Sequence, residues 1–218
     1  MGTGIRPTAS RTALLPVLVL VSSVAAFEVS NRVLEYVQQE FGDEARGRLE
    51  TWQGLQDMAQ SGSVERQLKL VNSFFNRVRF VNDIKHWGEE DYWATPIEML
   101  ATNGGDCEDF SIAKYLTLKS MGVPDDQLRI TYVKALELNQ AHMVLAWYPT
   151  PDADPMILDN LINDIRPASQ RPDLEPVYSF NGEGLWLNRM GGDNQRIGDA
   201  GRLSRWQDLN ERLLDSMR

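Results

Sequence analysis

The sequence predicts an α+β fold, with helices first in the chain and an antiparallel sheet after them. Apolar residues recur at helical spacing from Ser30 to about Phe80, and short segments rich in β-branched and aromatic residues follow Pro124. Strands and helices do not alternate, which argues against a parallel sheet built from βαβ units. With 218 residues, 42% of them hydrophobic, the chain is long enough to bury a core of its own.

The helical part begins with about three helices that carry apolar stripes. Gly42 and the segment 61–63 (Ser-Gly-Ser) divide them. The segment 81–101 is predicted to be a loop, and it carries Trp87 and Trp93 among charged residues. We expect these tryptophans on an exposed aromatic and acidic surface that can contact other molecules. A tryptophan folded back on the core is the alternative.

A clear helical run starts at Cys107 and ends at Gly122, with Pro124 beyond it as a stop. Strands are then expected over residues 128–136, 143–148 and 156–161, followed by a hairpin of residues 177–180 and 185–187. A last helix is expected from Arg205 to Met217, with Ser204 and Gln207 forming a capping box at its start. The nucleophile candidate Cys107 is thus predicted to stand at a helix N-terminus.

The charge and the first residues of the chain indicate an exported protein that does not bind nucleic acid. The 22 Lys and Arg residues against 31 Asp and Glu give a net charge of -9, which repels phosphate backbones. Residues 1–26 are typical of a signal peptide, with an apolar run over 13–21 and small residues before the cleavage point. An uncleaved anchor is the alternative. We expect one domain over residues 27–218, which does not span a membrane after cleavage.

Three residues stand where a nucleophile, a base and an orienting acid are needed. Cys107 opens a helix, whose dipole stabilises a thiolate, and two glycines before it allow the backbone to approach a substrate closely. His142 starts a predicted strand, and Asp159 ends the next one, where its carboxylate can orient the imidazole. Each also has a structural interpretation: Cys107 as a buried apolar residue, His142 as a core histidine with His86 as rival base, and Asp159 as a turn cap.

Four segments carry a resemblance to a known family. They are residues 91–96 (DYWATP), 104–115 (GGDCEDFSIAKY), 141–145 (AHMVL) and 158–160 (LDN). The chain resembles the bacterial transglutaminase-like cysteine proteinases of the LapG type, over nearly the whole of residues 27–218. The resemblance implies a papain/transglutaminase-like fold, with Cys107 as nucleophile, His142 as general base and then acid, and Asp159 as the orienting carboxylate.

The same resemblance implies a biological setting. The resemblance implies a periplasmic, calcium-dependent endopeptidase. Such an enzyme would cut a large surface adhesin near the adhesin's N-terminus, at a paired-alanine site, and so promote release from a biofilm. An inner-membrane cyclic-di-GMP receptor of the LapD type would hold the protease inactive. Calcium would lie on the acidic residues beside the nucleophile, which here are Asp106 and Glu108, with Asp109 as a further candidate.

Elementary electrostatics favours such a metal. Three carboxylates within two positions of a thiol raise its pKa by like-charge repulsion, and a bound Ca²⁺ would cancel that charge. The acidic residues lack the ligand spacing of an EF-hand, so without the resemblance a solvated acidic cluster is the preferred interpretation. Two other functions also remain open: a transglutaminase or amidase that uses the same three residues, and a non-enzymatic, calcium-ordered binding module with Cys107 buried.

Overall fold

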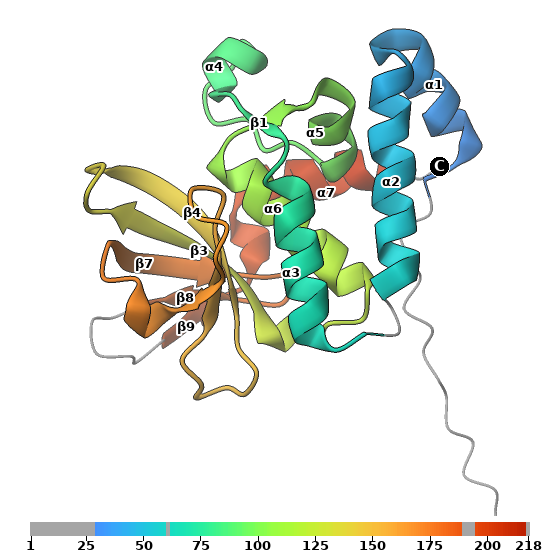
Figure 1. Ribbon diagram of the computed structural model, residues 1–218. Helices are drawn as coiled ribbons and strands as arrows, with labels where there is room; N and C mark the ends of the chain where they lie inside the picture. The colour runs from blue at the N-terminus through green and yellow to red at the C-terminus, as the bar shows by residue number, and fades with distance from the viewer. Residues whose placement is uncertain (1–28, 60–61, 189–194, 217–218) are drawn as a thin grey trace, which may run out of the picture.

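The computed structural model describes residues 29–59, 62–188 and 195–216, and it shows the predicted α+β architecture. Helices cover one face of a seven-stranded antiparallel sheet (Figure 1). The signal peptide expected over residues 1–26 lies outside the described residues. No helix in the described ranges combines the length and the apolar character that crossing a membrane would require.

The three predicted N-terminal helices are present as α1 (Asn31–Phe41), α2 (Asp43–Ala59) and α3 (Val64–Phe75). Ser30 and Ser63 cap α1 and α3, each accepting a hydrogen bond from the backbone N–H three residues on. Gly42 ends α1 with a φ of 89°, which a side chain would disfavour. The apolar stripes of these helices therefore face the core, as predicted.

Helix α6 (Cys107–Ser120) is the centre of the molecule and lies between the sheet and the other helices (Figure 1). All its residues except Cys107 and Lys119 are buried, which is the pattern of a helix covered on every side. The indole N–H of Trp52 on α2 donates to Thr117 Oγ1 at 2.9 Å and joins the two helices inside the core. A firmly packed α6 fixes the position of its first residue, Cys107.

The sheet has the order β6-β5-β4-β3-β7-β8-β9, with every neighbouring pair antiparallel. Its strands are β3 (Leu128–Ala135), β4 (Gln140–Trp147), β5 (Met156–Leu158), β6 (Arg166–Pro167), β7 (Leu174–Phe180), β8 (Leu185–Leu187) and β9 (Gln195–Gly198). Strand β4 begins three residues before the predicted start because Gln140 pairs with Ala135 across the β3–β4 turn. The predicted hairpin is confirmed as β7 and β8.

The segment predicted as a loop, 81–101, contains two helices, so this prediction is wrong there. Helix α4 (Asp83–His86) is short, and α5 (Pro96–Thr102) starts with a capping box. The Glu98 backbone N–H donates to the Thr95 hydroxyl, and the Thr95 N–H donates to the Glu98 carboxylate. Strand β1 (Arg79–Phe80) pairs in parallel with β2 (Gly104–Gly105), which leads directly to Cys107.

The last helix, α7, runs from Ser204 to Ser216. The carbonyl of Leu203 accepts the hydrogen bond from the Gln207 N–H, so Ser204 is the first helical residue and not the predicted cap. Three single turns complete the described chain, η1 (Asp125–Gln127), η2 (Ala168–Gln170) and η3 (Ala200–Arg202). Turn η2 matters for the site because Arg171 follows it directly.

Candidate active site

A cleft of about 510 Å³ opens over the start of α6. Cys107, His142, Asp106 and Glu108 all line it, so the structure brings these predicted site residues to one place. Its other walls come from β3, β4, β7, the segment before α5, turn η3 and the start of α7. The residues are Tyr132, Ala141, Met143, Tyr178, Asp91, Trp93, Arg202, Leu203, Ser204 and Arg205. Asp159 does not line the cleft and lies behind His142.

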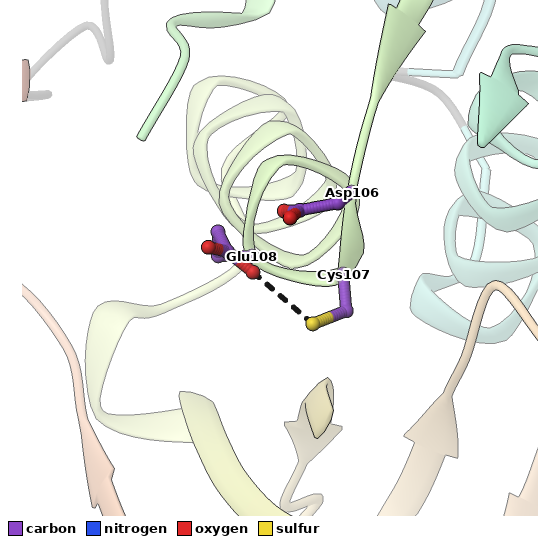
Figure 2. Close-up of side chains that lie close together, drawn as sticks. All are labelled: Asp106, Cys107 and Glu108. Carbon is purple, nitrogen blue, oxygen red and sulfur yellow. Dashed lines mark hydrogen bonds between the residues drawn. The ribbon is translucent and has the colours of Figure 1, made fainter. Parts of the chain in front are cut away.

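The Cys107 thiol is held by its own acidic neighbour. It donates a hydrogen bond to Glu108 Oε2 at 3.1 Å, as the dashed line in Figure 2 shows. Asp106 and Glu108 lie on either side of Cys107 in the sequence, and one ligand atom from each of the three residues falls within 4.8 Å of the others. The thiol therefore lies between two acidic side chains.

Burial and the acidic neighbours both act on the pKa of the thiol. Burial raises the pKa of Cys107 well above its ordinary value, and the charge and hydrogen bond of Glu108 and the charge of Asp106 raise it further. The backbone N–H of Met143, which follows His142 on β4, donates to the sulfur and acts in the opposite direction. Without a compensating positive charge, Cys107 stays a protonated thiol at neutral pH.

His142 and Asp159 form a buried pair. His142 Nε2 lies 2.8 Å from Asp159 Oδ1, and both side chains are almost fully buried. The pairing of strands β4 and β5, in which Leu145 lies opposite Leu158, brings the two side chains together. Asp159 directly follows Leu158, and His142 lies three positions before Leu145. With Nε2–H donating to the carboxylate, Nδ1 is left as the acceptor nitrogen.

Asp159 is ionised and surrounded by hydrogen-bond donors. Burial would raise its pKa, but the hydrogen bond and charge of His142, the backbone N–H of Leu161 and the guanidinium of Arg171 outweigh burial and hold the pKa at about 2. The Lys114 ammonium on α6 is also buried, and burial lowers its pKa to about 7 against the opposing charge of Asp159. The sequence analysis missed both Arg171 and Lys114. Only Lys114 could have been noticed, because a charged residue within an apolar helical run is unusual.

The rival base, His86, is not part of the cleft. Its Nε2 lies 2.8 Å from Thr102 Oγ1, and its ring packs on Gly104 so closely that a Cβ there would lie 2.7 Å from His86 Cε1. A Cβ at Gly105 would lie 2.7 Å from Asp109 Oδ2. The two glycines are therefore needed for contact with His86 and Asp109, which is a reason for glycine at these positions besides the predicted close approach to a substrate.

A second acidic group lies beneath the first. Asp83 at the start of α4, Asp106 and Asp109 each place a carboxylate oxygen within 4.8 Å of the others. Asp109 Oδ1 accepts from the Ala94 N–H and its Oδ2 from the Asp106 N–H, so Asp109 also holds the loop together. Oδ1 of Asp83 and Oδ1 of Asp106 are buried and find no hydrogen-bond partner in the described part of the chain.

The carboxylates of this group resist ionisation. Burial and the neighbouring acidic groups raise the pKa of Asp83 to about 6 and that of Asp106 to about 10. Burial also raises the pKa of Asp109. Buried, unpartnered carboxylate oxygens that repel one another are what a hard divalent cation binds, so the residues fit calcium. Asp83 was missed because it lies more than twenty positions before Cys107 and is brought there by the β1–β2 pair.

The exposed aromatic surface expected around Trp87 and Trp93 is not found. Trp93 is 5% exposed, stacks on Phe180 at 5.5 Å between ring centroids, and donates its indole N–H to Asp91. Trp87 is half-buried against Tyr92 and His86. The capped start of α5 turns this segment back on the core, and only Trp93 reaches the cleft wall.

The chain is similar to proteins of known family and structure. The model of the bacterial transglutaminase-like cysteine proteinase family (BTLCP) matches residues 28–174. LapG of Legionella pneumophila, in an EGTA-treated form, is 46% identical and superposes with a TM-score of 0.76, covering 87% of this chain and 99% of that chain. The calcium-bound form is 47% identical, with a TM-score of 0.71 over 83% and 98% of the two chains. A comparison with curated proteins found no match.

These similarities bear on the reaction class as well as on the fold. The fold is transglutaminase-like, with Cys107 at the start of α6, and the matched family consists of cysteine peptidases. The family match covers more than half of the chain, and the identity to LapG extends over most of it. The chain therefore belongs to the bacterial transglutaminase-like cysteine proteinase family and is a cysteine peptidase.

Proposed function

We propose that the protein is a calcium-dependent endopeptidase in which Cys107, His142 and Asp159 carry out peptide hydrolysis. The observation that carries this proposal is the buried His142–Asp159 pair, with an Nε2–Oδ1 distance of 2.8 Å, beside the only cysteine of the chain in a shared cleft. That arrangement leaves His142 Nδ1 free to accept a proton from the thiol.

The reaction proceeds through an acyl-enzyme. His142 Nδ1 takes the proton of the Cys107 thiol as the sulfur attacks the scissile carbonyl carbon and forms a C–S bond. His142 then gives that proton to the leaving nitrogen as the C–N bond breaks, which leaves a thioester on Cys107. Water, deprotonated by His142, attacks the thioester, and the released thiolate recovers its proton. Asp159 keeps the imidazole in one tautomer and stabilises it when it is charged.

The acidic residues beside the thiol are proposed as the calcium site. Asp106 and Glu108 would hold the ion with Asp83, and Asp109 would support them from beneath. When bound, calcium supplies the positive charge that offsets the repulsion between these carboxylates. Glu108 accepts the thiol hydrogen bond in this structure, and a Glu108 carboxylate that held the metal would accept it less strongly and leave the thiol proton more available to His142. The calcium-bound and EGTA-treated LapG structures support a calcium role here.

The substrate proposed is a large surface adhesin, cut near its N-terminus at a paired-alanine site in the periplasm to promote biofilm release. The inhibitor proposed is an inner-membrane cyclic-di-GMP receptor of the LapD type. The support is the 46% identity to LapG over 87% of the chain, together with the signal-like segment 1–26 that would direct export.

The test mixes the purified protein with the N-terminal segment of a candidate adhesin from the same genome. Cleavage is followed by gel electrophoresis and intact mass, with calcium, with EGTA, and with the Cys107→Ala variant. We expect two fragments whose masses sum to the substrate plus one water, formed only by the intact enzyme with calcium. Addition of a primary amine separates the transglutaminase alternative, which would give an amine adduct instead of fragments.

A further inference from the structure

Arg171 is a buried cation that the proposed reaction does not yet use. Its side chain is 2% exposed, and its Nη2 donates to Asp159 Oδ2 at 2.8 Å. The other oxygen of the same carboxylate, Oδ1, lies 2.8 Å from His142 Nε2 and accepts from the Leu161 N–H at 2.9 Å. Arg171 and His142 therefore hold opposite oxygens of one carboxylate, and rotation of the Asp159 side chain would break both contacts.

Arg171 is itself fixed in place from its other side. Asp173 accepts from Nε at 2.9 Å and from Nη2 at 2.8 Å, which is the two-pronged geometry of a guanidinium with a carboxylate. Asp173 is partly exposed, with 28% of its side chain accessible. The contacts form a continuous row, Asp173–Arg171–Asp159–His142, that runs from the surface to the base.

The Arg171 guanidinium has two separate effects on the Asp159 carboxylate. The guanidinium adds a hydrogen bond to those from His142 and the Leu161 N–H, and together these donors hold the pKa of the buried Asp159 carboxylate low enough to keep it ionised. The guanidinium also draws Oδ2 away from the imidazole, so that only Oδ1 faces Nε2. The charge of Asp159 acts on the buried Lys114 as well, but no hydrogen bond joins the Lys114 ammonium to Asp159 among the described residues. Orientation of the carboxylate thus depends on Arg171 at Oδ2 together with the Leu161 N–H at Oδ1.

We infer that Arg171 is a positioning residue for catalysis, which acts on His142 through Asp159 and never touches the substrate. This inference rests on the proposed roles of His142 and Asp159. Loss of the guanidinium would let Asp159 turn and would leave the imidazole free to rotate, so the fraction of enzyme with Nδ1 facing the thiol would fall. Substrate binding would be unaffected, because Arg171 does not line the cleft.

The surroundings of Arg171 allow a direct chemical test. Arg171 lines a second cavity, of about 800 Å³, together with Val133, Val144 and Ile157. These strand residues alternate with those that pack on α6, so the cavity lies on the opposite face of the sheet. Nη1 of Arg171 is buried and has no hydrogen-bond partner among the described residues. Removal of the Arg171 side chain therefore opens a space beside the cavity. A small guanidinium ion can enter from there.

The experiment measures kcat and KM for cleavage of the N-terminal adhesin segment, with calcium, by Arg171→Ala, Arg171→Lys and Asp173→Asn. Arg166→Ala is the matched control, because Arg166 is an exposed arginine five positions before Arg171 in the sequence and its ion pair with Asp164 lies outside the cleft. Each protein is also assayed with methylguanidinium and, at equal ionic strength, with sodium chloride. Thermal unfolding of each variant shows whether it is folded.

We expect Arg171→Ala to lower kcat by about 10- to 100-fold with KM little changed, as for loss of a group that acts on orientation. Methylguanidinium should restore several-fold of that loss, and sodium chloride should not. The kcat of Arg171→Lys and of Asp173→Asn should fall less than that of Arg171→Ala, and the kcat of Arg166→Ala should not change. A folded Arg171→Ala variant with wild-type kcat would overturn the inference, as would a loss carried entirely by KM. If Arg171→Ala does not fold, an unchanged kcat in both Arg171→Lys and Asp173→Asn overturns it.

The same assay includes Asp159→Asn, which separates the inference from the function on which it rests. Full activity of Asp159→Asn would contradict the proposed triad itself. Severe loss in Asp159→Asn together with wild-type kcat in the Arg171 variants would contradict only the positioning role.

Discussion

The charge of Asp159 should contribute to stability as well as to catalysis. Its pKa is held at about 2, against an ordinary value of 3.8, and the difference corresponds to about 2 kcal/mol of stabilisation of the folded state. Because the folded pKa lies below the unfolded one, this stabilisation is fully present above about pH 4 and is lost as the pH falls toward 2. The Asp159→Asn substitution removes the charge and keeps the shape of the side chain.

Urea unfolding of metal-stripped protein, followed by tryptophan fluorescence, measures this effect. At pH 5 the Asp159→Asn variant should be less stable than the wild type by at least about 2 kcal/mol, since Asn also loses one acceptor toward Arg171. The difference should narrow as the pH is lowered toward 2.5. Asp164→Asn, which changes an exposed aspartate nearby, serves as the control and should show almost no difference. A stability difference of Asp159→Asn that does not change between pH 5 and 2.5 would refute the electrostatic reasoning.

Three further predictions concern the thiol, the metal and the glycine before the site. Cys107→Ala should abolish cleavage while changing the free energy of unfolding by only about 1 kcal/mol, as measured by urea titration, and His142→Ala should be similarly inactive. Chelation with EGTA should stop cleavage, and added calcium, but not magnesium, should restore it. Asp106→Asn or Glu108→Gln should weaken calcium binding as measured by calorimetry. Gly105→Ala should destabilise the protein by about 1–3 kcal/mol, because the new Cβ would lie 2.7 Å from Asp109 Oδ2. Gly47→Ala on α2, where a Cβ meets no atom within 4 Å, should not destabilise it.

Local signals made much of the fold predictable. The start of α6 at Cys107 and its end before Gly122 followed from helix-start and helix-stop residues, and the strand segments followed from their composition. The closeness of His142 and Asp159 could be anticipated because each lies by a predicted strand, and β4 and β5 proved to be neighbours. Helix α5 could also have been found, since Thr95, Pro96 and Glu98 form a recognisable start signal.

Other parts of the site depend on tertiary contacts that no local pattern encodes. Asp83 reaches Asp106 only because β1 pairs in parallel with β2 and brings α4 beside the start of α6. Arg171 reaches Asp159 from the turn after η2, in a segment whose residues look like an ordinary polar loop. Trp93 resembled an exposed loop tryptophan, but stacking on Phe180 of β7 buries it. Long-range partners of this kind become visible only in the folded chain.

The most direct test of the account is capture of the acyl-enzyme on Cys107. The protein with calcium is mixed with the N-terminal adhesin segment, quenched in acid at short times, and digested for peptide mass spectrometry. The account predicts a transient thioester on Cys107 that carries the N-terminal fragment of the substrate and that is absent in EGTA and in Cys107→Ala. Cleavage at the wild-type rate by Cys107→Ala, or an acyl adduct on any other residue, would contradict it.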